Sequence, residues 1–175
     1  MAERSSLEMN TLEEAQGKLQ VQTVNLRETK ITVRDDIDVH YINHKELMSQ
    51  SFRRVAQIKE ISLTNSNEED FWEYRYYYHV GLRALNNAEE VASQSDDYVP
   101  AIEVVSVFEA RYISMSQVSQ DCLNAFSEHN VGYHIWPYWR ELVQSSCARI
   151  GLSPSFEIPH YMSHKSSEVE NTLTE

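Results

Sequence analysis

Seven histidines and several clustered acids are the side chains of this chain best suited to metal binding or proton transfer. His40 and His44 are four residues apart, the spacing of two metal ligands on one helical turn, and Asp35, Asp36 and Asp38 precede them. This segment shows no helical period, so we expect histidines of an exposed loop here and no metal site.

The remaining reactive side chains do not form a catalytic set either. Glu103 and Glu109 share one face of a predicted strand, but the strand separates them too widely for a paired acid–base device. Cys122 and Cys147 lie in predicted helices without CxxC spacing, which favours free thiols in a reducing cytoplasm. Four glycines leave no phosphate-binding loop. We therefore expect no enzymatic activity and no cofactor.

Length, charge and hydrophobic patterning argue against several classes of partner. A chain of 175 residues suits one domain with a substantial core, and its net charge of −12 argues against nucleic acid as a ligand. No apolar run approaches the ~20 residues of a membrane span. The first residues carry no secretion signal pattern. These features predict a cytoplasmic protein that does not insert into membranes.

Hydrophobic patterning predicts four strands followed by two helices. The strands cover about 19–33, 53–64, 71–85 and 101–113, and the first contains a phase slip between Val21 and Val24 that indicates a bulge. In the third strand, alternate positions from Trp72 to Ala84 are apolar or aromatic, which is typical of an antiparallel sheet covered on one side. Residues 35–51 are expected to form a long connection.

Two helices are predicted to follow the strands. A capping box of Ser114 and Gln117 would begin the first helix, and Asn130 and Gly132 would end it. The second helix carries a highly aromatic face over 135–150, with Pro137 in its first turn, and is expected to end at Gly151.

Taken together, the order of the elements predicts an α+β fold, a four-stranded antiparallel sheet with two C-terminal helices. We expect a flexible N-terminal tail over 1–17, a single domain over 18–162, and an acidic flexible tail over 163–175. Two helices cannot cover the sheet fully, so oligomerisation is expected.

This arrangement resembles the SecB protein-export chaperones over roughly 19–162. The family's Pro-Tyr-x-Arg-Glu helix motif matches Pro-Tyr-Trp-Arg-Glu at 137–141, followed by Arg-Ile-Gly at 149–151. The proline-bounded tail of the family matches Pro-Ser-Phe-Glu-Ile-Pro at 154–159, and its opening strand matches Leu-Gln-Val-Gln at 19–22.

The resemblance implies a homotetramer, a dimer of dimers, that acts as an ATP-independent holdase. It would hold unfolded polypeptides such as preproteins and pass them to SecA. Client-binding grooves would be bordered by the loop after the first strand and by the long helix. The residues that the resemblance implies for these grooves are Val39, Tyr41, Ile42, Leu47, Phe52, Trp136, Trp139 and Leu142. A core position is the alternative for each of the two tryptophans.

The resemblance also implies an acidic SecA-docking patch on the outer sheet, represented here by Glu28, Glu103 and Glu109. Lys30 and Arg34 dilute its charge, and a serine at 106 stands where the family pattern has an acid. This departure leaves open a SecB-like chaperone dedicated to a toxin–antitoxin system, with the antitoxin as client. The alternatives from other functional classes are a protein–protein adaptor and a protein that binds a small ligand or a metal.

Overall fold

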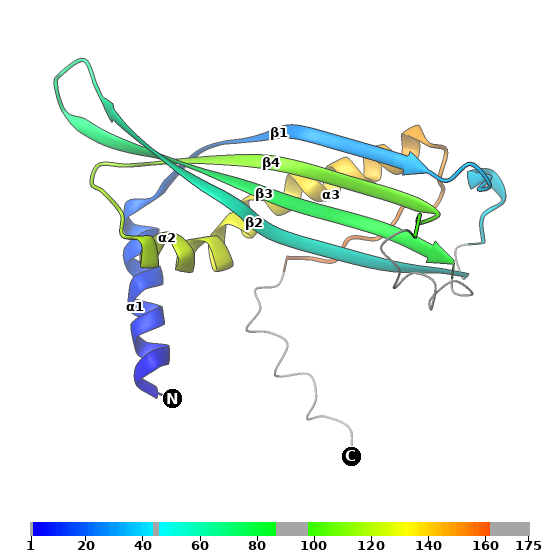
Figure 1. The fold of residues 1–175 in the computed structure, drawn as a ribbon, viewed down its shortest axis with the longest axis horizontal. Coiled ribbons are helices and arrows are strands. Elements are labelled where there is room, and N and C mark those ends of the chain that lie inside the picture. Colours follow the sequence, from blue (N-terminus) through cyan, green and yellow to red (C-terminus); the bar gives the residue numbers. More distant parts are fainter. Residues whose placement is uncertain (1, 44–45, 87–97, 162–175) are drawn as a thin grey trace.

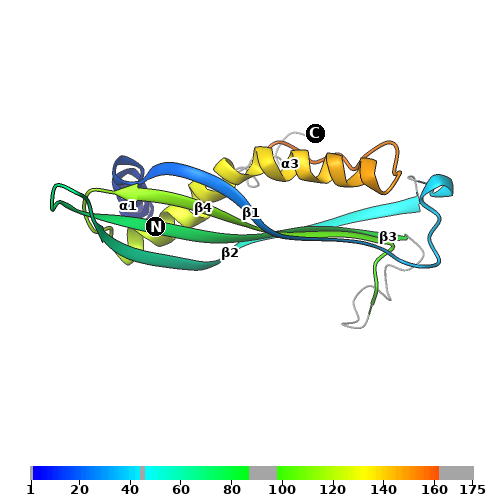
Figure 2. The same cartoon turned by 90° about the horizontal axis from the view of Figure 1, so that it is seen from above.

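A single antiparallel sheet organises the chain, in strand order β1-β4-β3-β2, so that β1 and β2 form its two edges. The computed structural model describes residues 2–43, 46–86 and 98–161. Its elements are α1 (Ala2–Lys18), β1 (Gln20–Val33), a 3-10 turn (Val39–Tyr41), β2 (Leu47–Thr64), β3 (Asp70–Asn86), β4 (Ile102–Ser114), α2 (Gln120–Phe126), a π-helical turn (Ser127–Val131) and α3 (Gly132–Arg149). The helix α3 lies along one face of the sheet, and α1 and α2 lie toward the end that carries the β2–β3 hairpin (Figure 1, Figure 2).

Alternation in the strands gives the sheet two different faces. We call the face against α3 the helix-side face and the opposite one the outer face. On the helix-side face, the even-numbered positions of β3 from Tyr74 to Ala84 are buried, as the sequence pattern predicts. They pack with alternate residues of β4, and Phe126, Ile135, Trp139 and Val143 of the helical segment complete the core.

The strands differ from the sequence prediction mainly in β2. The predicted slip in β1 is confirmed, since its register with β4 shifts between Val21 and Thr23. The strand β2, in contrast, begins at Leu47 and not near Arg53, because residues 47–51 pair with the end of β3. Their sequence, Leu-Met-Ser-Gln-Ser, lacks an apolar alternation, so the pairing with β3 is what identifies them as part of the strand. The connection is correspondingly shorter than expected.

The N-terminal segment is a helix, and the expectation of a flexible tail there is wrong. Helix formers such as Ala, Leu and Glu dominate α1, although its apolar stripe is weak. Ala15 and Leu19 are buried in the core, and Gln16 donates a hydrogen bond to Asn130 at 3.1 Å. These contacts attach α1 to the other helices. The expected acidic tail over 163–175 lies outside the described residues.

The helix α2 starts later than the predicted capping box. Ser119 is its N-cap, and its side chain accepts a hydrogen bond from the backbone N–H of Cys122. Ser114 instead ends β4, where its hydroxyl donates to the carbonyl of Ser116 at 2.7 Å. The chain needs the intervening residues to cross from the sheet to the helical layer, and the Val118 N–H anchors them on the Tyr74 hydroxyl.

Asn130 and Gly132 do not stop the helical run, contrary to the prediction. A π-helical turn continues α2 directly into α3, and Gly132 has helical backbone angles. Gly132 has a packing role, because a Cβ there would lie 2.5 Å from the Tyr161 hydroxyl oxygen. Pro137 consequently lies inside α3 and not in its first turn, which leaves the Tyr133 carbonyl without its usual helical donor.

The end of α3 confirms the prediction of a stop at Gly151. Gly151 has a φ of +78°, a left-handed conformation that glycine adopts without steric cost. Its N–H donates to the carbonyl of Ala148, and the Leu152 N–H donates to that of Cys147 at 2.9 Å. The chain then returns along α3 over 152–161, the C-terminal segment, which brings the buried residues Leu152 and Ile158 into the core (Figure 1).

Candidate functional site

The two tryptophans of α3 occupy different environments. Trp139 is 1% exposed and belongs to the core, which settles one of the alternatives that the sequence left open. Trp136 is one helical turn earlier, 9% exposed, and lies at the border between the core and the surface. On the same helix, Tyr133 and Tyr138 are 63% and 50% exposed. The aromatic side chains of α3 therefore serve both the core and a surface.

Trp136 joins three parts of the chain. Its indole N–H donates a hydrogen bond of 2.8 Å to the carbonyl of Pro159 in the C-terminal segment. Its ring meets that of Tyr161 edge-on, with centroids 5.5 Å apart. The Arg53 guanidinium of β2 lies 5.2 Å from the Trp136 ring and 4.6 Å from the Tyr161 ring. These contacts fix the C-terminal segment between α3 and the edge strand β2.

A cavity of about 500 Å³ opens beside Trp136, between α3 and the end of the C-terminal segment. We call it the aromatic pocket. It is lined by Tyr133, His134, Trp136, Pro137, Tyr138, Arg140, His160 and Tyr161. Rings form most of this lining, and aromatic rings make favourable contacts with apolar side chains of many shapes.

Two polar groups of the aromatic pocket set its electrostatics. His134 lies with its Nδ1 atom 2.9 Å from the Tyr112 hydroxyl, and burial lowers the pKa of His134 below its usual range. Burial thus favours the neutral form of the imidazole. Arg140 places Nη1 3.5 Å from His160 Nδ1, while its Nε is buried without a hydrogen-bond partner in the described structure.

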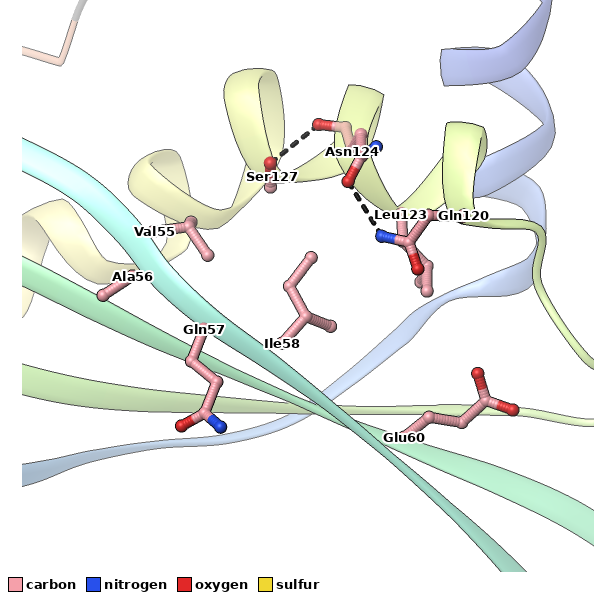
Figure 3. Close-up of a pocket in the computed structure, with 9 residues that line it drawn as sticks. All are labelled: Val55, Ala56, Gln57, Ile58, Glu60, Gln120, Leu123, Asn124 and Ser127. Carbon is pink, nitrogen blue, oxygen red and sulfur yellow. Dashed lines mark hydrogen bonds between the residues drawn. The ribbon is translucent and has the colours of Figure 1, made fainter.

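A second cavity, of about 340 Å³, lies between the edge strand β2 and α2 (Figure 3). We call it the β2–α2 groove. Ile58 points toward α2 and Leu123, whereas Gln57 points away (Figure 3). β2 has a register shift between Val55 and Gln57 at this point and pairs on one side only. An edge strand beside a cavity of mixed polar and apolar lining suits an extended peptide, because the unpaired backbone groups of the strand can bond to the peptide.

The loop residues expected in a client groove lie at the other end of α3. Val39, Ile42 and, at the start of β2, Leu47 are partly buried against the core, as is Leu142 within α3, whereas Tyr41 is 87% exposed. The neighbouring His40 ring lies against Gly151, just after α3 ends. With fifteen residues between Trp136 and Gly151, this loop lies roughly 20 Å along the helix from the aromatic pocket. The structure therefore does not bring the loop and Trp136 into direct contact.

Phe52 lies on the opposite side of the sheet from these groups. The register pairs Phe52 with Gly81, between outer-face positions, and a Cβ at residue 81 would lie 2.2 Å from the Phe52 ring. The ring thus covers the glycine backbone on the outer face. Phe52 cannot share a groove with Trp136 in this structure, because β2 and β3 separate them.

The three acids expected at a docking surface do share the outer face. Glu28, Glu103 and Glu109 pair with outer-face positions of the neighbouring strands. Their environments differ, because Glu28 is exposed whereas Glu109 is 4% exposed. Glu109 has one oxygen without a hydrogen-bond partner, and the nearest cation, Arg27, is 4.0 Å away.

Sequence reasoning missed Tyr133 and Tyr161, which line the aromatic pocket, and Arg53, which packs on the Tyr161 ring. The exposure of Tyr133 follows from the helical period of α3, which places it off the buried stripe. The roles of Tyr161 and Arg53 depend on the return of the chain along α3, for which the sequence has no local signal. The Ile58 and Leu123 pair likewise depends on how α2 packs against β2.

The described residues show neither a cluster of metal ligands nor a helix that could span a membrane. No group of three or more His, Cys, Asp or Glu side chains lies close enough to hold a metal ion within 2–43, 46–86 and 98–161. His44, the second histidine of the His40–His44 pair considered above, lies outside the described residues. Among the helices of this part of the chain, none is long and apolar enough to cross a membrane.

No protein-family model matches the chain, and no curated protein sequence does. Among solved structures, the fold is similar to a SecB-like chaperone of Mycobacterium tuberculosis, solved in complex with a ChAD peptide from the HigA1 antitoxin. The TM-score is 0.56 at 16% identity, and the match covers 87% of this chain and 99% of that one. This likeness confirms the expected fold class, an α+β fold of SecB-like type.

Proposed function

We propose that this protein is an ATP-independent holdase that binds segments of unfolded polypeptides. The observation that carries the proposal is the aromatic pocket, with Tyr133 and Tyr138 exposed at its rim, in a fold similar to that of a peptide-bound chaperone. Exposed tyrosines on a rigid helix provide apolar contact area at a low cost in side-chain entropy.

The energetics of such contacts suit a holdase. Each buried client side chain contributes about 1.5–3 kcal/mol, and ordering a disordered chain offsets much of that gain. Useful affinity then requires several weak contacts along one client. The β2–α2 groove supplies a second contact surface beside the same edge strand that carries Arg53. A client that follows β2 would reach both cavities.

A chaperone dedicated to one partner is the second form of this proposal. It is favoured by the antitoxin peptide in the similar structure. Dedicated binding predicts strong protection of one partner and weak protection of unrelated unfolded proteins. Delivery of preproteins to SecA through Glu28, Glu103 and Glu109 has less support, since basic side chains surround these acids on the outer face.

Self-assembly into a homotetramer belongs to the same proposal. Val21 and Leu26 of the edge strand β1 are 46% and 45% exposed, although their register places them on the helix-side face with Tyr112 and Phe108. In the described structure α3 leaves these side chains uncovered. A second copy that packs on β1 would bury them and pair the free strand edge.

Suppression of aggregation tests the chaperone proposal. The double variant Tyr133→Ser/Tyr138→Ser removes exposed rings and is expected to keep the fold, since both side chains are largely in solvent. We expect it to suppress aggregation of chemically unfolded clients several-fold less well than the parent protein. Met115→Ser, at an equally exposed apolar residue outside both cavities, is the control and should retain activity.

A third variant separates the pocket from the loop. Tyr41→Ser changes the most exposed of these tyrosines, at the other end of α3. Loss of activity in this variant alone would assign the client-binding site to the loop that contains Tyr41. Failure of the parent protein to protect several unrelated clients, with protection of one antitoxin-like partner, would favour the dedicated form. Protection of none would reject the chaperone proposal.

A further inference from the structure

The outer face of the sheet carries an excess of basic side chains in a protein whose net charge is −12. Strand register assigns side chains to this face, because directly paired residues of antiparallel strands share a face. The basic residues placed there are Arg27, Lys30, Arg54, Lys59, Arg75, Arg83 and Arg111, against the acids Glu28, Glu73, Glu103 and Glu109. The net charge of this face is therefore positive, whereas the net charge of the whole chain is negative.

Three of these cations form a row across adjacent strands. Lys59 of β2 pairs with Arg75 of β3, and Arg75 pairs with Arg111 of β4. We call these residues the cation row. Like charges directly opposite each other destabilise a sheet. The cation row therefore needs compensating groups.

Neighbouring groups compensate the repulsion within the cation row only in part. The Glu73 carboxylate accepts hydrogen bonds from both Arg75 and Arg111, and the Lys59 ammonium lies 5.0 Å from the centroid of the Tyr77 ring. Burial opposes ionisation of Glu73, but the two arginine hydrogen bonds outweigh it and hold its pKa below the usual range. One carboxylate thus serves two guanidinium groups, and the contact of Lys59 among the described residues is with an aromatic ring.

These cations remain accessible from solvent. The side chains of Arg75 and Arg111 are about a third exposed, at 33% and 35%, although the Arg111 Nε itself is buried. Arg27, at the edge of the same region, is 57% exposed, and its contact to Glu109 is as long as 4.0 Å. These cations can therefore accept additional carboxylates without breaking the Glu73 contacts.

We propose that the outer face binds an acidic segment of a polypeptide partner, whose carboxylates contact the cation row and Arg27. The proposal goes beyond the holdase function and does not depend on it, since the two cavities lie on the helix side of the sheet. Neighbouring strands are about 4.8 Å apart, so the cation row spans about 10 Å. An extended peptide rises about 3.4 Å per residue, so about three residues of it cover this span.

A polypeptide fits this surface better than a nucleic acid does. Glu73 and Glu109 lie within the cationic region and would repel a continuous line of phosphates. The net charge of −12 would add a long-range repulsion against a polyanion. A short acidic peptide carries fewer charges and can place its carboxylates between these acids.

Fluorescence anisotropy with a labelled poly-glutamate peptide and the full chain tests the proposal. We expect saturable binding that weakens with added salt. Lys59→Glu and Arg27→Glu, both at side chains without close ion pairs, should each weaken binding about fivefold, since each reverses one surface charge. Arg149→Glu makes the same charge change at the end of α3 and should leave the affinity unchanged.

Four results would overturn the proposal. They are no binding of the peptide, an equal loss in Arg149→Glu, tighter binding of a labelled single-stranded oligonucleotide that Lys59→Glu abolishes, or a change of the light-scattering mass in Lys59→Glu. The last would identify the face as an interface between copies. Suppression of client aggregation should be unaffected in Lys59→Glu, so the two proposals can fail separately.

Discussion

Tyr161, in the segment that follows α3, packs directly onto Gly132 at the start of that helix. A Cβ at residue 132 would lie 2.5 Å from the Tyr161 hydroxyl oxygen and 2.7 Å from its ring. The same ring contacts Trp136 and the Arg53 guanidinium. The absence of a side chain at Gly132 therefore determines where the C-terminal segment can lie and, with it, one wall of the aromatic pocket.

Gly132→Ala should displace Tyr161 and loosen the C-terminal segment. We expect faster proteolysis after α3 and a changed tryptophan fluorescence, because Trp136 loses a neighbouring ring. Gly17→Ala is the matched control, since a Cβ there meets no atom within 4 Å in helix α1. Alanine in an exposed helix should stabilise that variant by up to about 1 kcal/mol. Equal proteolysis of both variants would contradict the role given to Gly132.

Trp139 and Tyr138 are neighbours in sequence, but their substitution is expected to change stability by very different amounts. Trp139→Ala removes a fully buried ring and should reduce the free energy of unfolding by about 3–5 kcal/mol. Tyr138→Ala changes a half-exposed ring and should stay within about 0.5 kcal/mol of the parent. Urea denaturation followed by circular dichroism measures both. A small effect of Trp139→Ala would mean that this ring is not in the core.

His134 should make stability dependent on pH. Burial lowers its folded pKa below the ordinary value of 6.5, so the unfolded state binds the proton more tightly. The stabilising contribution is complete above pH 6.5 and is lost as the pH falls through the folded pKa. His134→Gln should flatten this part of the curve of unfolding free energy against pH. An unchanged slope in the variant would assign the dependence to another group.

The two buried acids of the outer face provide a further matched pair. Glu73 accepts hydrogen bonds from two arginines, so Glu73→Gln should destabilise the protein by about 1–2 kcal/mol, allowing for partial solvent screening. Glu109 has an oxygen without a donor, so Glu109→Gln should change the free energy of unfolding by less than about 0.5 kcal/mol. Thermal denaturation at neutral pH compares them. The reverse order would contradict this assignment of partners.

Leu26→Asp tests whether β1 takes part in assembly. An aspartate at this uncovered position should lower the molar mass measured by light scattering if a second copy packs on β1. Val99→Asp, at a residue of similar exposure outside the sheet, should leave the mass unchanged. A parent protein that is already monomeric would reject the assembly proposal.

The sequence predicted well the features that depend on local period. The alternation of β3, from Tyr74 to Ala84, required only that one face of a strand be buried. The stop at Gly151 required only the left-handed conformation of that residue. Such features are encoded within a few consecutive residues, so no knowledge of the tertiary structure was needed.

The candidate site was much less predictable. The face of Phe52 depends on its pairing with Gly81, and the role of Gly132 depends on Tyr161, nearly thirty residues later. Hydrophobic side chains of the loop and of α3 were expected to form one groove, although the structure places them at opposite ends of the helix. Long-range register and the path of the C-terminal segment decide these positions, and single-sequence patterns do not report them.

The contact between Phe52 and Gly81 also has a consequence for how the longest hairpin forms. A shift of β2 by two residues against β3 would place the Phe52 ring opposite His79 or Arg83, whose side chains occupy the space that Gly81 leaves empty. Polar residues near the open end of this hairpin give little other discrimination between registers. The aromatic ring over the glycine thus selects, by steric fit, one register of β2 against β3.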